Sequence, residues 1–185
     1  MPPSLSRTSE PDSDLTPGLE PVVSAETRVL VLGSLPSQAS IEVQQYYGNV
    51  RNAFWTVMGT LAGAGPELPY TQRLQRLRLA GIGLWDVLAA AVRPGSLDSR
   101  IDVTTARTND FGGFLDDCPS VRCIGFNGKT AGRLFRADAG AMRAVDLHRV
   151  SLVDLPSTSP AHASMTVDAK CRRWSELIAC HLEHE

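Results

Sequence analysis

Short apolar runs and amphipathic segments alternate along the chain from residue 28 onward. Residues 28–32 form an apolar, β-branched run that stops at Gly33, which predicts a buried strand entering a tight loop. Three later runs of the same character predict strands at 82–88, 121–126 and 150–155. Helical patterns lie between and after these strands, at 37–46, 52–61, 70–80, 108–115 and 166–182. A further helix follows the turn at 127–130 and extends through residue 135. This alternation predicts a three-layer α/β/α sandwich with a mostly parallel central sheet of about four strands.

The beginning of the chain differs from the rest in composition. Residues 1–26 are rich in Pro, Ser, Asp and Glu and show no apolar period. Such a segment buries little surface, so we expect a flexible tail at 1–26. The total of 185 residues suits one domain with a sizeable core, which we expect at 27–185.

Cysteine spacing and hydropathy limit the classes of protein to which this chain can belong. The 4 cysteines have no C-x-x-C spacing and no secretory leader precedes them, which predicts reduced thiols in a cytoplasmic protein. Cysteines and histidines also lack the spacing of a metal site, so we expect no metal and no other cofactor. No apolar run approaches the length that spans a bilayer, so no membrane contact is expected.

The charge leaves the kind of partner open. A formal net charge of −2 argues, taken alone, against a nucleic-acid-binding protein. Among the basic residues only Lys129 and Lys170 are lysines, and the others are arginines. Arginine makes planar, bidentate contacts to phosphate, although a GC-rich genome would also favour it. A DNA enzyme that handles one nucleotide at a time needs only a local basic face, so DNA binding remains compatible with this charge.

The loop after the first predicted strand is a candidate binding site. Gly33 permits unusual dihedral angles, and Pro36 restrains Leu35 to extended conformations, so the backbone amides of this loop can be held toward a ligand. The crevice at the carboxyl end of a parallel strand is also where open α/β sheets bind ligands.

Aromatic, amide and guanidinium groups gather shortly after this loop, at residues 46–55. Phe54 and Trp55 suit a hydrophobic core, which is the commoner fate of a buried aromatic pair. Tyr47 and Asn52 lie outside any apolar period, and we therefore predict that they belong to a site.

Three further positions offer polar chemistry. Asp86 is a lone carboxylate at the end of the second predicted strand, where a charge is either paired or functional. Lys129 follows a strand in a Gly-Lys-Thr turn, but Cys123 stands where a nucleotide-binding phosphate loop needs glycine. Lys129 therefore faces either a DNA phosphate or solvent. His162, in a Ser-Pro-Ala-His sequence, carries an imidazole that can titrate near neutral pH.

Several segments resemble, in order, the motifs of the hypoxanthine-DNA (deoxyinosine) glycosylases, a branch of the uracil-DNA glycosylase superfamily. The first motif corresponds to GSLPS, QQYY and RNAFW, and the others to GIGLWDVL (81–88), RPGSLDSRI (93–101), FNGKTA (126–131) and LPSTSPAHA (155–163). The resemblance covers residues 28–175. It implies a monomeric enzyme without cofactor that hydrolyses the N-glycosidic bond of hypoxanthine, with uracil as a second substrate. Its partner would be DNA containing deoxyinosine or deoxyuridine.

The resemblance also implies a catalytic residue. Other uracil glycosylases carry Asp or Asn at the position of Leu35, and leucine cannot orient water. Asn52 falls where the hypoxanthine enzymes have the asparagine taken to be catalytic, with Asn49 as the alternative. Tyr47 corresponds to the aromatic ring that stacks on the flipped base.

Asp86 stands where classical uracil glycosylases have an asparagine that recognises the base. An ionised Asp86 can accept a hydrogen bond from N1–H of hypoxanthine, and it would repel the lone pair at N1 of adenine. The alternative is that Asp86 pairs with Arg93 or Arg100 and only shapes the loop.

Two larger sets follow from the same resemblance. The expected substrate-binding residues are Gly33, Ser34, Leu35, Tyr47, Asn49, Asp86 and Asn127. The expected DNA-binding residues are Ser157, Thr158, Ser159, Pro160, His162 and Lys129. His162 replaces the asparagine of the relatives. Two other functions stay open, a uracil or mismatch-specific uracil-DNA glycosylase and a non-catalytic DNA-binding protein of the same fold.

Overall fold

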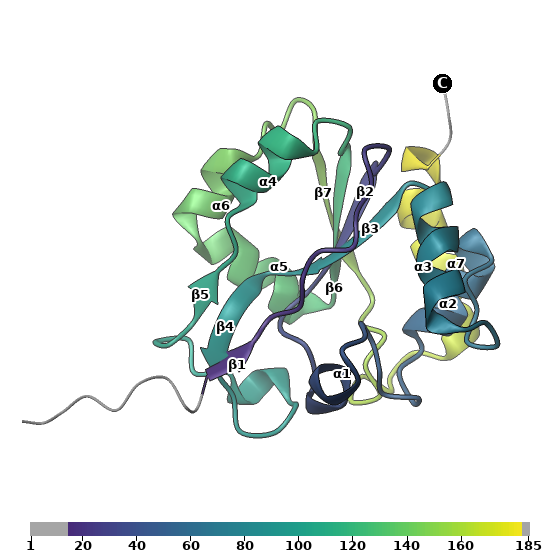
Figure 1. Cartoon of the computed structure of the whole chain (residues 1–185), viewed down its shortest axis with the longest axis horizontal. Helices are drawn as coiled ribbons and strands as arrows, with labels where there is room; N and C mark the ends of the chain where they lie inside the picture. Colours follow the sequence, from purple (N-terminus) through teal and green to yellow (C-terminus); the bar gives the residue numbers. More distant parts are fainter. Residues whose placement is uncertain (1–14, 183–185) are drawn as a thin grey trace, which may run out of the picture.

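Parallel strands form the central sheet of the computed structural model, which describes residues 15–182 (Figure 1). They are β2 (Val29–Gly33), β3 (Ile82–Asp86), β6 (Cys123–Asn127) and β7 (Ser151–Leu155), in the order β3-β2-β6-β7. Every neighbouring pair in this sheet is parallel. β2 and β6 are buried on both faces, which explains their continuous apolar sequences. The four predicted strands and their parallel sheet are confirmed.

Helices cover both faces of this sheet (Figure 1). One face is covered by α2 (Phe54–Ala62), α3 (Tyr70–Leu79) and α7 (Val167–Ile178), and the other by α4 (Phe111–Asp117), α5 (Lys129–Ala137) and α6 (Ala139–Ala144). Alternate residues of β2 point to opposite sides, with Val29 and Val31 in one hydrophobic core and Leu30 and Leu32 in the other. The predicted three-layer α/β/α sandwich is therefore confirmed.

Side chains define where several helices begin. α1 (Gln38–Val43) starts after Ser37, whose Oγ accepts a hydrogen bond from Ser40 N–H at 3.2 Å, and it ends at Gln44 in the left-handed conformation. α1 is thus shorter than the helix predicted at 37–46. Thr166 begins α7 by accepting from Ala169 N–H at 3.2 Å. The 3-10 turns are η1 (Asp98–Arg100) and η2 (Ala179–His181).

A small antiparallel sheet accompanies the central one and was not predicted. It contains β1 (Leu15–Pro17), β4 (Leu88–Val92) and β5 (Arg107–Thr108), in the order β1-β4-β5. The apolar run at 82–88 predicts one strand, but β3 ends at Asp86 and the chain continues into β4. Alanine favours strands weakly, so the pairing of β4 is set by its neighbours and not by its own sequence. Because β5 takes residues 107–108, the helix predicted at 108–115 starts only at Phe111.

The prediction of a flexible tail at 1–26 is wrong for residues 15–26. β1 pairs with β4, and Val22 exchanges backbone hydrogen bonds of 2.9 and 2.8 Å with Leu84 of β3. Val22 is 9% exposed and belongs to the core. Strand pairing at a sheet edge uses backbone groups that every residue offers, so composition alone does not reveal it. The domain thus includes residues 15–26, and the rest of the predicted tail, 1–14, lies outside the described residues.

Deleting residues 1–26 is therefore expected to destabilise the protein. The truncation removes the buried side chain of Val22 and the pairing of β1 with β4. Burial of one valine contributes about 2 kcal/mol, which corresponds to a fall in Tm of about 4–8 °C for a domain of this size. A truncation of residues 1–14 keeps both features and is the control. Equal melting temperatures of the two truncated proteins, measured by circular dichroism, would contradict this prediction.

Candidate active site

A cavity of about 340 Å³ opens at the carboxyl edge of the central sheet. The last residues of its strands line this cavity, namely Gly33, Asp86, Asn127 and Leu155. β2 comes first in sequence and lies between β3 and β6, so the strand order reverses at β2. Open α/β sheets bind ligands at such a switch point, which makes this cavity the candidate active site.

Most of the residues that were predicted to bind substrate or DNA, or to be catalytic, line this cavity. They are Gly33, Ser34, Leu35, Tyr47, Asn52, Asp86, Asn127, Lys129, Ser157, Thr158, Ser159 and His162. Asn49 and Pro160 lie outside the lining. Asn49 Oδ1 accepts from Arg51 N–H at 3.0 Å, and its carbonyl accepts from Asn52 N–H at 2.8 Å. Asn49 therefore shapes the turn that precedes Asn52.

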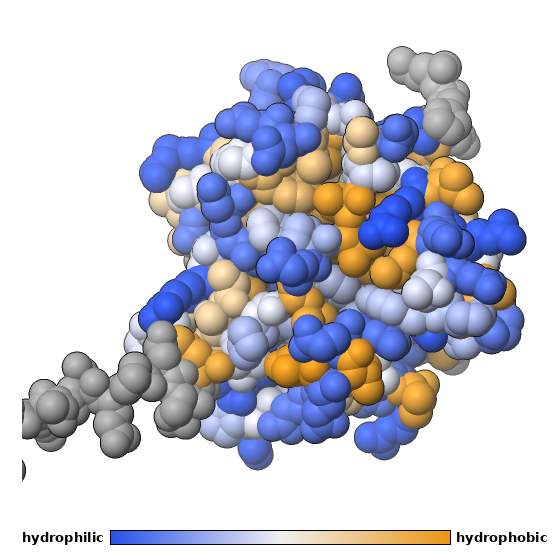
Figure 2. Space-filling model, viewed as in Figure 1, coloured by the Kyte–Doolittle hydropathy of each residue, from blue (hydrophilic) through white to orange (hydrophobic). Residues whose placement is uncertain are grey.

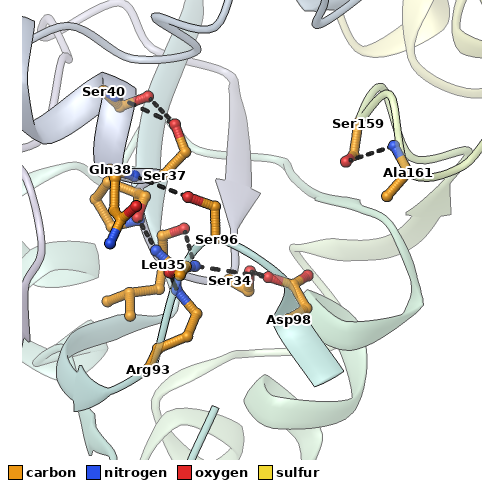
Figure 3. A network of polar contacts seen from close by, with 12 residues as sticks. Ser34, Leu35, Ser37, Gln38, Ser40, Arg93, Ser96, Asp98, Ser159 and Ala161 are labelled. Atoms are coloured by element: carbon orange, nitrogen blue, oxygen red, sulfur yellow. Dashed lines mark hydrogen bonds and ion pairs between the residues drawn. The ribbon is translucent and has the colours of Figure 1, made fainter. Parts of the chain in front are cut away.

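Arg93 holds the loop after β2 in place (Figure 3). Its guanidinium is buried and donates to the carbonyl oxygens of Leu35, at 3.1 Å, and of Pro36. Its Nε donates to the carbonyl of Gly95 at 3.2 Å. Because Arg93 is engaged by these carbonyls, the backbone of residues 34–36 is fixed beside the cavity.

Asp98 also lines the cavity, and it was not among the predicted site residues. Its Oδ1 accepts a hydrogen bond of 2.6 Å from Ser34 Oγ and lies 3.8 Å from Arg93 Nη1 (Figure 3). Asp98 belongs to the segment RPGSLDSRI, which was the only signal in the sequence that pointed to it. The structure thus adds a second carboxylate to the site.

Asp86 is a buried carboxylate with an unused oxygen. The residue is 4% exposed, and within residues 15–182 its buried Oδ2 has no hydrogen-bond partner. Burial raises the pKa of Asp86 to about 7, with Arg93 lowering it and Asp98 raising it further. Among the described residues Arg93 forms its ion pair with Asp98 and not with Asp86. The alternative that an ion pair between Asp86 and Arg93 shapes the loop is therefore not supported. Asp86 can therefore accept a hydrogen bond from a ligand when ionised or donate one when neutral.

Gly33 leaves room for this carboxylate. A Cβ atom at Gly33 would lie 2.5 Å from Asp86 Oδ1 and 3.7 Å from the Tyr47 hydroxyl. Any side chain at this position would displace the carboxylate, so glycine is required by the close approach of Asp86.

Tyr47 presents an aromatic ring to the cavity. It stacks on Phe54 with 3.7 Å between ring centroids and 16° between planes. Burial raises the pKa of Tyr47, and a hydrogen bond with the Asn127 side chain opposes this rise. The backbone of Tyr47 has a φ of 54°, which is uncommon for a residue with a side chain. Phe54 and Trp55 belong to the core, as predicted.

Asn52 lines the cavity at the start of α2. Its Oδ1 accepts a hydrogen bond from Phe54 N–H at 3.0 Å. An amide oxygen has two acceptor sites, so this contact leaves capacity for a second donor such as water. The next residue, Ala53, donates its N–H to the carbonyl of Thr158 at 3.0 Å, which joins this segment to the loop after β7.

The loop after β7 is held from several sides. Asn127 donates to Thr158 Oγ1 at 2.8 Å and accepts from Thr158 N–H at 2.9 Å, so Asn127 joins the end of β6 to this loop. On the side of α7, Lys170 Nζ donates to the carbonyl of His162 at 2.9 Å and Trp174 Nε1 donates to that of Pro156 at 2.9 Å. These contacts fix the loop at the cavity rim.

The exposed residues of this rim suit contact with a polyanion. Lys129 and His162 are exposed and line the cavity together with the hydroxyls of Ser157 and Ser159. Ser159 Oγ accepts from Ala161 N–H at 3.2 Å, across the site from Asp98 (Figure 3). Hydroxyl and ammonium groups are common donors to phosphate oxygens.

Neither a metal cluster nor a membrane span is found in the part of the chain that the structure describes. In residues 15–182 no group of three or more His, Cys, Asp and Glu side chains is arranged to hold a metal ion. Over the same range no helix combines the length and the apolar character needed to cross a bilayer.

Comparisons with known proteins agree with this geometry. No family model matches the sequence. The chain is 44% identical over 116 residues to a hypoxanthine DNA glycosylase from Methanosarcina acetivorans, covering 62% of this chain and 72% of the relative. It is 39% identical, with the same coverage, to a hypoxanthine DNA glycosylase from Methanosarcina barkeri. A solution NMR structure from Methanosarcina acetivorans, described as a candidate uracil DNA glycosylase, matches with a TM-score of 0.74 at 36% identity, over 92% of this chain and 99% of that one.

Proposed function

The chain belongs to the hypoxanthine DNA glycosylase branch of the uracil-DNA glycosylase superfamily, and from this membership we propose that it excises hypoxanthine from DNA by hydrolysing the N-glycosidic bond. The product would be an abasic site, and uracil would be a second substrate. The observation that carries this proposal is one cavity at the carboxyl edge of the sheet, lined by Asn52, Tyr47 and Asp86.

The size and walls of the cavity suit one extruded base. Enzymes that do chemistry on a base take it out of the helix into a pocket and stack it against an aromatic ring. A cavity of about 340 Å³ is within the range of small-ligand sites. Tyr47, held by its stack on Phe54, supplies the ring in this proposal.

Asp86 would recognise the edge of the base. Hypoxanthine presents N1–H beside O6, and the unpartnered Oδ2 of Asp86 can accept from that N–H. The amides of Ser34 and Leu35, on the loop fixed by Arg93, would donate to O6. Uracil offers the same pair of groups, N3–H beside O4. Adenine has a lone pair at N1 that an ionised Asp86 repels.

Asn52 would act at the sugar. Cleavage of an N-glycosidic bond passes through an oxocarbenium-like sugar, so a water must be held near C1′. Asn52 lines the cavity, and its Oδ1 can accept from that water in addition to Phe54 N–H. Leu35, the residue at the usual position of the polar group, has an apolar side chain that cannot do so.

The rim would bind the DNA backbone. We assign phosphate contacts to Ser157, Ser159, Lys129 and His162, because all four line the cavity. A monomer suffices in this proposal, since one chain supplies every residue of the site. On the face shown in Figure 2, hydrophobic residues form several groups that lie between hydrophilic ones.

A single-turnover assay tests the proposed function. Duplexes that contain inosine, uracil, xanthine or a thymine mismatch are incubated with excess protein, and alkali then cleaves the abasic sites. We expect cleavage of the inosine duplex first and of the uracil duplex more slowly. A preparation that binds these duplexes and cleaves none of them would identify a non-catalytic DNA-binding protein. Preference for uracil would identify a uracil-DNA glycosylase.

Excision is expected to continue after metal removal. The proposed site uses an amide, carboxylates and backbone donors, and none of its roles requires a Lewis acid. The inosine duplex should be cleaved at an unchanged rate after prolonged dialysis against EDTA. Loss of activity that added zinc or magnesium restores would contradict this prediction.

A further inference from the structure

A second carboxylate at the cavity needs a physical reason. Asp98 lines the cavity with a side chain that is 41% exposed, so it lies nearer the opening than the buried Asp86. DNA is a polyanion, and a negative charge close to its phosphates opposes binding. Arg93 offsets this charge only in part, because its guanidinium is 3.8 Å away and bonded to backbone carbonyls.

Asp98 is hydrogen-bonded to the neighbour of Leu35, the position at which other uracil glycosylases carry a polar side chain. Ser34 Oγ donates to Asp98 Oδ1 at 2.6 Å, and Ser34 directly precedes Leu35. This hydrogen bond and Arg93 fix one oxygen of the carboxylate (Figure 3). Among the described residues no hydrogen bond is made to Oδ2 of Asp98. A carboxylate oxygen at the opening of the cavity is thus available to a substrate.

We propose that Asp98 is a second catalytic residue, whose carboxylate faces C1′ of the extruded nucleotide and accepts a proton from the attacking water. The inference deepens the proposed glycosylase function and rests on it. Asp86 at the closed end of the cavity would meet the base, and Asp98 nearer the opening would meet the sugar, where positive charge develops. A negative group is favourable there even though it opposes phosphate binding.

The step balances as a hydrolysis. The C1′–N9 bond of deoxyinosine breaks, and its electron pair leaves with the base. The oxygen of the water, aimed by Asn52, forms the new bond to C1′, and one water proton passes to Asp98. Asp98 then returns this proton to solvent, and the departing base takes up one from solvent. Burial raises the pKa of Asp98, with Ser34 and Arg93 opposing the rise, which makes the carboxylate a better proton acceptor than an exposed one.

The competing explanation is that Asp98 only anchors the loop after β2 through Ser34. Two variants separate the roles. Asp98→Asn removes the charge but keeps an oxygen that accepts from Ser34, whereas Ser34→Ala removes the anchor and keeps the charge. Asp116→Asn, an exposed carboxylate on α4, is the matched control for the loss of one negative charge.

The experiment measures single-turnover cleavage of an inosine duplex at saturating protein, together with affinity for the abasic-site product duplex. We expect Asp98→Asn to cleave about a hundredfold more slowly and to bind DNA at least as tightly as the wild type. Ser34→Ala should lose less than Asp98→Asn, and Asp116→Asn should match the wild type. Near-wild-type cleavage by Asp98→Asn, or a larger loss in Ser34→Ala, would overturn the proposal in favour of the anchor. Absence of cleavage by the wild type would instead overturn the glycosylase function itself.

Discussion

Replacing Asn52 with alanine is expected to slow excision of hypoxanthine by about two to four decades, because the group that aims the attacking water at C1′ is lost. Asn52 lines the cavity, and Leu35 supplies no polar group at the usual position. Phosphate contacts dominate DNA affinity, so binding to the inosine duplex should change little. Single-turnover rates and binding, measured on the same preparation, make the test.

The structure also predicts a modest effect of this substitution on stability. Asn52 Oδ1 accepts from Phe54 N–H at 3.0 Å at the start of α2. Loss of one such hydrogen bond costs about 1 kcal/mol, or about 2–4 °C in Tm for a domain of this size. The control is Asn49→Ala, which removes an equivalent amide from the preceding turn and lies outside the cavity lining. Cleavage by Asn52→Ala within about threefold of wild type would show that Asn52 is not catalytic.

The central sheet could be predicted from sequence because its strands are buried on both faces. β2 has the burial pattern of a strand without a polar side, and its apolar run stops at Gly33 where the strand ends. The helix starts at Ser37 and Thr166 were equally visible, since a hydroxyl that accepts from a backbone amide two or three residues later is a local signal. Such features depend on neighbours in sequence.

Features that depend on distant neighbours could not be predicted. Ser34 and Asp98 are 64 residues apart, and Asn127 and Thr158 are 31 apart, so nothing local indicates either hydrogen bond. The same holds for β1, whose backbone pairs with β4 across more than seventy residues. Asn127 lines the cavity, as a substrate-binding residue would, and that role stays a prediction, whereas its two hydrogen bonds with Thr158 add a support of the rim loop.

Replacing Asp86 with asparagine is expected to slow excision of hypoxanthine about ten- to a hundredfold. The loss corresponds to one charge-assisted hydrogen bond, about 1.5–3 kcal/mol, if that bond acts in the transition state. Discrimination among bases with carbonyl groups should relax, because an amide can donate to a carbonyl as well as accept from an N–H. The assay compares Asp86→Asn and wild type on inosine, uracil and xanthine duplexes, and unchanged preferences would return Asp86 to a structural role.

The pH dependence gives an independent test of the same residue. Burial raises the pKa of Asp86 to about 7 in the empty cavity, so the ionised fraction increases about tenfold between pH 6 and pH 8. If the ionised form accepts from N1–H, wild-type excision of hypoxanthine should rise by about that factor over this range. Asp86→Asn has no carboxylate to titrate and should show a flatter profile. A wild-type rate that is constant or falls from pH 6 to pH 8 would exclude the ionised carboxylate as the acceptor.

As pH rises, the stability of the folded protein should fall while the rate of excision increases. The pKa of Asp86 is raised in the folded protein, so the folded state keeps a proton that the unfolded chain has lost between about pH 4 and pH 7. The contribution of Asp86 to the free energy of unfolding therefore falls as pH rises through this window, and above it the protein holds a buried charge with an unpartnered oxygen. Asp86→Asn removes that charge and is expected to melt at a higher temperature than wild type at pH 8, with a smaller difference at pH 5. A lower Tm of Asp86→Asn at pH 8 would mean that the carboxylate is stabilised by contacts in the fold, and base recognition would no longer be needed to explain its presence.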